Sequence, residues 1–314
     1  MPIPAQLQGR LALPVICAPM FIVSNPELVI AQCKSGVVGS FPALNARPKE
    51  ELEAWLDRIE TALAGDPKAA PFAVNQIIHQ SNERLDHDLD VCIRHKVPLI
   101  ITSLRAPTDI VPAVHGYGGL VFHDVISVRH AEKALEAGVD GLILVCAGAG
   151  GHAGTLNPFA LVAEIRRFYD GPIALSGSIT NGSAVLAAQA MGADFAYVGT
   201  RFIATKEANA VERYKECIVE SGANDVVYTP YFTGVHGNYL KASIEAAGLD
   251  PANLPQRDKT AMDFGGGAAK AWRDIWGAGQ GVGAITDIPP AADLISRMKE
   301  EYAAAKAALC SNPF

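Results

Sequence analysis

The chain has 314 residues, of which 49% are hydrophobic, so it is long enough to bury one large core. Its 26 basic and 33 acidic residues give a net charge of −7 without a basic run, which excludes the usual electrostatic binding of nucleic acid. No window of about 18 apolar residues could span a bilayer, and no signal peptide opens the chain, so we expect a cytoplasmic protein with no membrane partner.

Eight short apolar runs recur along the first two thirds of the chain, separated by segments with helical periodicity. This alternation is typical of repeated βα units around a parallel sheet. The predicted strands are residues 15–18, 37–40, 72–75, 99–103, 120–123, 141–145, 173–176 and 195–198, and helices are predicted at 49–63, 82–95, 128–137, 157–168 and 182–191. Eight strands favour an α/β fold closed into a TIM (β/α)₈ barrel over an open doubly wound sheet.

The regular alternation ends after Phe202, and residues 207–274 differ in character. This segment is too long for a βα loop, so we interpret it as a helical insertion or small lid domain on the substrate side of the barrel. Residues 1–206 and 275–314 then form the barrel, closed by an amphipathic helix within 285–309. The aromatic side chains of the insertion either close the substrate side or form its own core: Tyr228, Tyr231, Phe232, His236 and Trp272.

The ends of the last two predicted strands carry Ser176-Gly177-Ser178 and Gly199-Thr200. In barrels, the loops after strands seven and eight bind phosphate through backbone N–H groups and small hydroxyls. Either motif alone is also explained as a tight turn. Because both lie at matching strand ends, the sequence predicts a phosphate cradle.

A glycine-rich segment, Ala-Gly-Ala-Gly-Gly-His-Ala-Gly at residues 147–154, follows the sixth predicted strand. Its glycines, including Gly150 and Gly151, allow a flat ligand to lie against the backbone, and they place His152 at the mouth of the barrel. Imidazole is the usual group for moving a proton near neutral pH. We predict that His152 is catalytic, although no acidic partner can be named, and we interpret the other seven histidines as structural.

Polar or polarisable side chains also follow the earlier strands. They are Ala18-Pro19-Met20 after the first strand, Asn75 at the end of the third, Ser103 at the end of the fourth and Asp124 after the fifth. Each alone is a common strand terminus, but together they place suitable groups around one face of the barrel, as a bound cofactor requires. In the closing segment, Gln280 either reaches the same ligand or begins a helix.

Signature motifs of other enzyme classes are missing. No Gly-x-Gly-x-x-Gly follows a strand with an acidic residue about 20 positions later, and neither a Gly-x-Ser-x-Gly elbow nor a Walker loop occurs. The six cysteines are scattered, without a Cys-x-x-Cys pair or zinc-ligand spacing. We therefore expect reduced thiols and no metal site.

As a set, five segments resemble the nitronate monooxygenase family, formerly called 2-nitropropane dioxygenases. They are Ala18-Pro19-Met20, Ala149-Gly150-Gly151-His152-Ala153-Gly154, Leu175-Ser176-Gly177-Ser178-Ile179, residues 192–202, and Gly279-Gln280-Gly281-Val282-Gly283. The resemblance spans nearly the whole chain apart from the insertion. It implies a barrel that holds FMN, with the phosphate at residues 176–178 and 199–200 and the flavin ring near Pro19, Met20, Asn75 and Gly151.

The resemblance also implies an activity. His152 matches the family's catalytic histidine, which removes the α-proton of a neutral nitroalkane or helps to position an anionic nitronate. The flavin takes electrons from the nitronate and passes them to O₂, which yields a carbonyl compound and nitrite. The implied function is that of an FMN-dependent nitronate monooxygenase, with a small-molecule nitronate or nitroalkane and O₂ as partners; a homodimer is left open.

Two positions depart from the family pattern. Some relatives, including NADH:quinone reductases, carry a lysine after strand five that touches the flavin, and this chain has Asp124 there. Because an acidic group does not pair with a reduced, anionic flavin, the role of Asp124 is left open. The loop after Met20 reads Phe21-Ile22-Val23-Ser24, where many members have glycines, which predicts a more apolar and differently shaped substrate pocket.

Two other functions remain as alternatives. An FMN-dependent NAD(P)H oxidoreductase of the same superfamily, such as a quinone reductase or an enoyl-acyl carrier protein reductase, would bind FMN at the same residues but receive hydride from a nicotinamide. A flavin-free barrel could use the phosphate cradle to bind a phosphorylated metabolite, as a lyase or isomerase, and would be colourless.

Overall fold

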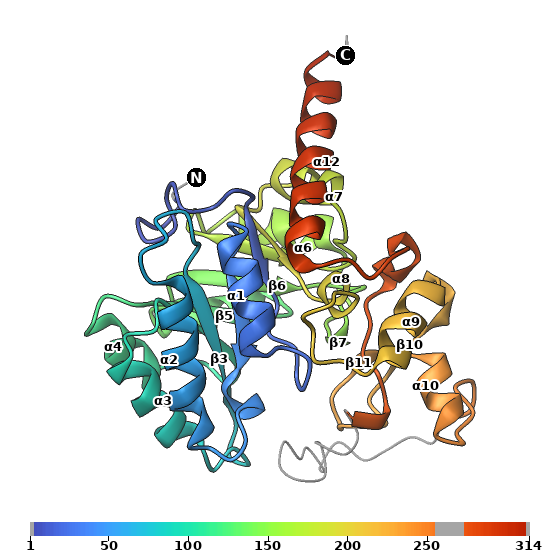
Figure 1. Cartoon of the computed structure of the whole chain (residues 1–314), viewed down its shortest axis with the longest axis horizontal. Helices are drawn as coiled ribbons and strands as arrows, with labels where there is room; N and C mark the ends of the chain where they lie inside the picture. Colours follow the sequence, from blue (N-terminus) through green and yellow to red (C-terminus); the bar gives the residue numbers. More distant parts are fainter. Residues whose placement is uncertain (1–2, 255–272, 312–314) are drawn as a thin grey trace.

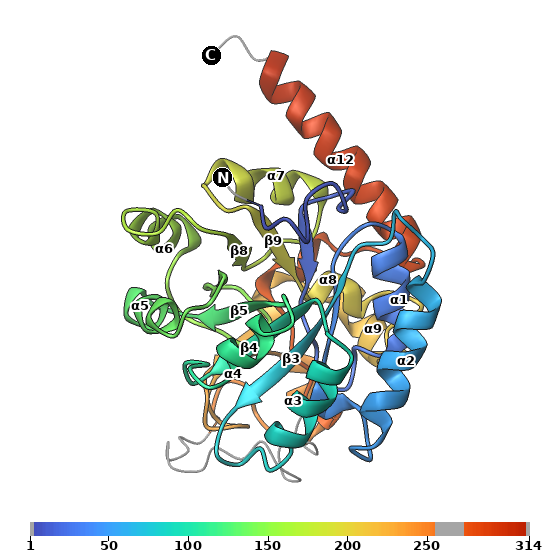
Figure 2. The ribbon, with the colours of Figure 1, turned by 90° about the vertical axis from the view of Figure 1, so that its left-hand side faces the viewer.

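The computed structural model describes residues 3–254 and 273–311. Its centre is an eight-stranded sheet in the order β1-β9-β8-β6-β5-β4-β3-β2, in which every pair is parallel. A parallel bridge between Ile16 and Val38 joins the two ends of this order, so the sheet closes on itself. Helices surround it on the outside (Figures 1 and 2). The predicted (β/α)₈ barrel is confirmed.

All eight predicted strands are present, each ending within three residues of its predicted bounds. They are β1 (Val15–Cys17), β2 (Gly39–Pro42), β3 (Phe72–Ile78), β4 (Leu99–Leu104), β5 (Leu120–Val125), β6 (Gly141–Val145), β8 (Ile173–Ser176) and β9 (Phe195–Val198). Successive side chains point to opposite faces of a strand. Ile16, Ile101 and Phe122 therefore fill the barrel interior, whereas their neighbours Val15 and Ile100 pack in a separate cluster with the outer helices.

The outer helices confirm the five that were predicted and add two short ones, α1 and α4. They are α1 (Pro26–Lys34), α2 (Glu51–Leu63), α3 (Leu85–Arg94), α4 (Ile110–His115), α5 (Val128–Glu136), α6 (Pro158–Ile165) and α7 (Gly182–Ala190). Side-chain oxygens of Asn25, Ser127, Asn157 and Asn181 cap the first turns of α1, α5, α6 and α7. These caps satisfy backbone N–H groups that a helix leaves unpaired, which fixes where each helix begins after its loop.

The closing segment returns to the barrel after residue 272. It forms the short helix η3 (Gln280–Ala284) and the long helix α12 (Ala291–Ser311), which packs on α7 and α1. The buried residues of α12 all lie in its first half, Ala291 to Met298, and its second half extends away from the body in both views (Figures 1 and 2). Among the described residues, no helix is long and apolar enough to cross a bilayer.

The segment predicted as a helical insertion contains a sheet as well as helices. Its elements are α9 (Glu212–Glu220), η2 (Ala223–Asp225), β10 (Val226–Thr229), β11 (Gly237–Leu240) and α10 (Lys241–Ala246). β10 pairs antiparallel with β11, and β11 pairs with β7 (Gly151–His152), which lies in the loop after β6. The insertion is therefore hydrogen-bonded to the predicted catalytic loop. Trp272 and its neighbours from residue 255 onward lie outside the described residues.

Candidate active site

A cavity of about 380 Å³ lies at the carboxyl ends of the barrel strands. Its volume falls within the range of small-molecule and cofactor sites, and this end of a TIM barrel is where active sites occur. It is lined by His152 and by every predicted cofactor residue except Gln280, namely Ala18, Pro19, Met20, Asn75, Ser103, Asp124, Gly150, Gly151, Ser176, Gly177, Ser178, Gly199 and Thr200. The barrel thus gathers residues that are far apart in the sequence.

Gln280 is placed differently from the other predicted residues. It begins η3, and its backbone N–H donates to Gly148 O at 2.9 Å. Its neighbours Gly279 and Gly281 line the cavity, whereas Gln280 itself does not. Of the two roles expected for Gln280, the structure shows that it begins a helix. Its contact with a ligand stays a prediction.

One side of the cavity is built from glycine-rich segments in close contact. A Cβ atom added at Gly150 would lie 2.7 Å from Gly279 N and 2.8 Å from Thr200 Oγ1, and one at Gly148 would lie 2.5 Å from Ser178 Oγ. Ser178 itself has φ of 56°, in the left-handed region. No lysine or arginine occurs among the described lining residues. An anion on this side would therefore rest on backbone N–H groups and hydroxyls.

His152 lies on β7, with its Nε2 atom 2.8 Å from Thr233 Oγ1. Thr233 Oγ1 also lies 3.1 Å from Val235 O and 3.3 Å from Val235 N, so this threonine is itself held in place beside the imidazole. Burial lowers the pKa of His152 to about 4, which keeps the ring neutral near pH 7. A neutral ring held in one orientation can accept a proton from a bound molecule.

The insertion supplies most of the groups that hold this loop. Asn238 Nδ2 donates to Ala149 O at 2.6 Å, and the Tyr228 hydroxyl donates to Ala153 O at 2.8 Å. Thr233 and Asn238 were missed by the sequence analysis because they follow the loop by more than 70 residues, whereas Tyr228 was named there among the aromatic residues of the insertion. The run Val226-Val227-Tyr228 was the one available signal, since β-branched and aromatic residues favour strands.

A chain of hydrogen bonds links three neighbouring strand ends on the other side of the cavity. Asn75 Nδ2 donates to Ser103 Oγ at 2.9 Å, and Ser103 Oγ donates to Asp124 Oδ2 at 2.6 Å. Burial raises the pKa of Asp124 to about 7, an effect that the bond from Ser103 partly offsets. Tyr197 of β9 also lines this part of the cavity. The three predicted residues therefore act as one unit.

The third part of the wall is apolar. Phe21 and Val23, in the loop that departs from the family pattern, line the cavity with Leu44. Ile22 has φ of 68°, which is strained for a β-branched residue. Asn45 holds the loop in this form, because its Oδ1 accepts from Ile22 N at 2.9 Å and its Nδ2 donates to Met20 O at 3.0 Å. The apolar side chains predicted for the pocket are thus present in its wall.

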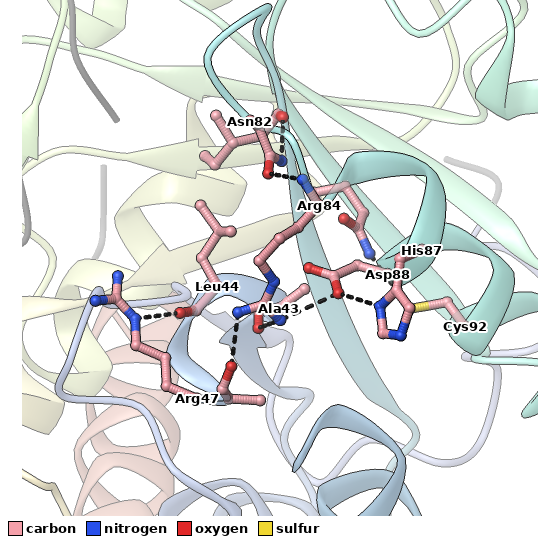
Figure 3. Close-up of polar contacts among 11 residues, drawn as sticks. Ala43, Leu44, Arg47, Asn82, Arg84, His87, Asp88 and Cys92 are labelled. Atoms are coloured by element: carbon pink, nitrogen blue, oxygen red, sulfur yellow. Dashed lines mark hydrogen bonds and ion pairs between the residues drawn. The ribbon is translucent and has the colours of Figure 1, made fainter. Parts of the chain in front are cut away.

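An ion pair between half-buried Arg84 and buried Asp88 lies next to the segment that carries Leu44 (Figure 3). Arg84 donates to Ala46 O at 2.7 Å and to Ala43 O at 3.2 Å, at either end of the short helix η1 (Ala43–Asn45). The same guanidinium lies 3.1 Å from Asp88 Oδ1, and His87 Nδ1 lies 3.0 Å from that oxygen. Asp88 is completely buried. The pair therefore fixes η1, which carries Leu44 and Asn45.

His130 is a lining residue that the sequence analysis interpreted as structural. It lies in the first turn of α5, where its backbone N–H is capped by Ser127. Its place in the helix that directly follows the end of β5, close along the chain to Asp124, was the signal that could have singled it out.

Comparisons with known proteins agree with this geometry. The model of the nitronate monooxygenase family matches residues 41–301. A nitronate monooxygenase of Paraburkholderia phytofirmans is 26% identical, with 92% of each chain covered. Among solved structures, nitroalkane oxidase from Streptomyces ansochromogenes superposes with a TM-score of 0.82 at 23% identity, covering 97% of this chain and 100% of that one. FabK from Thermotoga maritima gives a TM-score of 0.77 at 24% identity, with 96% of each chain covered.

Proposed function

The chain belongs to the nitronate monooxygenase family of oxidoreductases, and we propose that it is an FMN-dependent enzyme that oxidises alkyl nitronates with O₂. The products would be a carbonyl compound and nitrite. The observation that carries this proposal is the presence, in one cavity, of a glycine-lined wall and a neutral, oriented histidine. Neutral nitroalkanes would be a second class of substrate.

The described residues fit FMN. The backbone and hydroxyls of Ser178, Gly199 and Thr200 would hold its phosphate, where the close contacts of Gly148 and Gly150 leave no room for side chains. Asn75 and Asp124 would meet the edge of the flavin ring. When bound, FMN would supply the chemistry of accepting an electron pair from the substrate and passing it to O₂.

The chain's own residues would handle the substrate and its proton. The imidazole of His152 would accept the α-proton of a neutral nitroalkane, since burial keeps this ring unprotonated. For a nitronate, which has already lost that proton, the same ring would only position the substrate. Phe21, Val23 and Leu44 would bind the alkyl group and exclude water from it.

Anaerobic reduction tests the proposal against its main alternative. The purified protein, loaded with FMN, is mixed without O₂ with propyl-2-nitronate or with NADH, and the flavin absorbance near 450 nm is followed. We expect bleaching by the nitronate and, after O₂ is admitted, nitrite. Rapid, saturable bleaching by NADH alone would instead identify an NAD(P)H oxidoreductase. A protein that binds no FMN would contradict both.

A further inference from the structure

Tyr197 presents a hydroxyl group to the cavity, and no described residue forms a hydrogen bond with that group. The side chain lines the cavity but is only 6% exposed. Its oxygen is not one of the fully enclosed, unpaired atoms such as Asp124 Oδ1, so a molecule in the cavity can reach it. In native proteins, a largely buried polar group without a protein partner commonly marks a ligand or a water.

The register of β9 places the Tyr197 ring in the layer of the barrel interior that is nearest to the cavity. Tyr197 pairs with Ile16 of β1 and packs with Phe195 in the interior cluster. Because Tyr197 follows Phe195 by two residues on the same strand, it lies on the same face, closer to the carboxyl end. Ala18 and Val145 pack against this cluster and also line the cavity. These two residues and Tyr197 form part of the cavity floor, to which Tyr197 contributes a polar group.

Tyr214, the other tyrosine among the described lining residues, shows the contrast. Its hydroxyl donates to Gly277 O and is therefore already used within the protein. Burial raises the pKa of both tyrosines, so both hydroxyls keep their protons near neutral pH. The Tyr197 hydroxyl is thus a donor that remains available to a bound molecule.

Tyr197 lies between the two parts of the cavity that are proposed to hold the ends of FMN. Along β9, it precedes Gly199 and Thr200 of the predicted phosphate cradle by two and three residues. On the other side, the charge of Asp124 adds to the raised pKa of Tyr197, which indicates that this strand end is near. A ligand that extends from the cradle to Asp124 would therefore pass over the Tyr197 hydroxyl.

We propose that Tyr197 contacts the flavin, with its hydroxyl donating a hydrogen bond to an acceptor atom of the isoalloxazine ring. This inference rests on the proposed FMN cofactor and adds a binding residue to it. The ring is the expected partner because the Tyr197 side chain belongs to the barrel interior, whereas the phosphate cradle begins where the chain leaves β9.

The test measures flavin binding, without turnover. The parent protein and Tyr197→Phe are stripped of flavin and titrated with FMN, riboflavin and lumiflavin, and the quenching of flavin fluorescence gives Kd. Riboflavin lacks the phosphate, and lumiflavin lacks both the phosphate and the ribityl chain. We expect Tyr197→Phe to raise Kd by about fivefold to tenfold for all three flavins, because each contains the ring. The visible absorption spectrum of bound FMN should also change, since the lost hydrogen bond acts on the ring itself.

Tyr117→Phe is the matched control. The Tyr117 hydroxyl donates to Val97 O at 2.9 Å, and Tyr117 is not among the residues that line the cavity. This variant should leave all three Kd values unchanged. Circular dichroism and thermal melting show that each variant is folded, and Tyr197→Phe should melt close to the parent because it keeps the aromatic ring in the interior cluster.

Three results would overturn the inference. Unchanged Kd values in Tyr197→Phe would show that the hydroxyl does not bind the flavin. A loss for FMN or riboflavin with no loss for lumiflavin, or with an unchanged spectrum of bound FMN, would place the contact on the ribityl chain or the phosphate. An equal loss in Tyr117→Phe would indicate general loosening of the barrel. Each of these leaves FMN as the cofactor, whereas failure of the parent to bind any flavin would overturn the proposed function together with the inference.

Discussion

Two carboxyl groups on this barrel differ in their surroundings: that of Asp88 is buried and that of Asp124 is half-buried. Asp88 lies outside the cavity lining and is paired with Arg84 and His87. Asp124 lies in the wall itself, and the Ser103 hydroxyl is the one side-chain partner of its carboxyl among the described residues. A buried charge that is paired is part of the architecture, whereas an acid without a cation, facing a cavity, is a candidate for function. If this distinction holds, substitutions in the two regions should affect different properties.

The largest effect should come from the cavity side, at His152. His152→Asn removes the base, so activity on neutral nitroalkanes should fall by about 10²- to 10⁴-fold, whereas activity on preformed nitronates should change much less. Nitrite release from the two kinds of substrate gives this ratio. Equal losses on both would remove His152 as the base, and an altered FMN content would show a binding defect instead.

The next largest effect should come from Asp88, and it should be on stability. Arg84→Leu leaves the Asp88 carboxylate buried without its cation, which should lower the free energy of unfolding by about 3–5 kcal/mol in urea titrations. The matched control is Arg58→Leu, which breaks an exposed pair with Glu27 and should cost less than about 1 kcal/mol. Similar costs for the two variants would show that the Asp88 pair is no more important than a surface pair.

Asp124 should affect stability with a distinctive dependence on pH. Its pKa is about 7 in the folded protein against 3.8 for the free side chain, so the folded state binds more protons between these values. The apoprotein should therefore lose stability from Asp124 as pH rises from about 4 to 7, by at most about 4 kcal/mol. Asp124→Asn should be the more stable protein at pH 8, as measured by urea unfolding of the two apoproteins at pH 5 and pH 8.

The stability contribution of His152 changes with pH in the opposite direction to that of Asp124, so the two contributions have to be separated. Its pKa is about 4 when folded against 6.5 for the free side chain, so its contribution to stability is present above pH 6.5 and is lost as pH falls towards 4. The two slopes partly cancel in the parent protein. If Asp124→Asn unfolds with the same pH profile as the parent, Asp124 is not the acid with a raised pKa that the structure indicates.

The smallest effect should come from Thr233, which orients His152. Thr233→Val removes the hydroxyl that Nε2 contacts and should cost about 1 kcal/mol of stability. Its effect on activity should be confined to neutral nitroalkanes, with kcat reduced and the FMN content unchanged. A uniform loss on nitronates and nitroalkanes would indicate general loosening of the loop. Thr205→Val, which removes a buried hydroxyl that donates to Phe202 O and does not line the cavity, is the control.

The sequence was sufficient for most of the barrel because its strands are buried on both faces. β6, β8 and β9 begin and end at the predicted residues, since each is a short run made mostly of apolar residues. By contrast, β7 is a strand only because β11 pairs with it, and no property of a Gly-His dipeptide indicates that. The α1 helix was missed, although it is as long as α7, which was predicted.

Some residues of the candidate site could likewise be predicted from the sequence, and others could not. Strand-end residues such as Asn75, Ser103 and Asp124 could be predicted because parallel strands of a barrel bring their carboxyl ends to one face. The bonds between them depend on side-chain packing across three strands and became visible only in the structure, as did the lack of a lysine or arginine among the described residues that line the cavity. Thr233 and Arg84 belong to distant segments, and their roles follow from tertiary contacts alone.

The contacts of the closing segment have a consequence for the order in which the site is completed during synthesis. Gly279 N donates to Thr200 Oγ1 at 2.9 Å, and Gln280 N donates to Gly148 O, so the wall of the cavity includes residues near the end of the chain. The barrel strands are all made before residue 200. A nascent chain can therefore form its sheet before the binding wall is complete, because that wall also needs residues 279 and 280, made about 80 residues later.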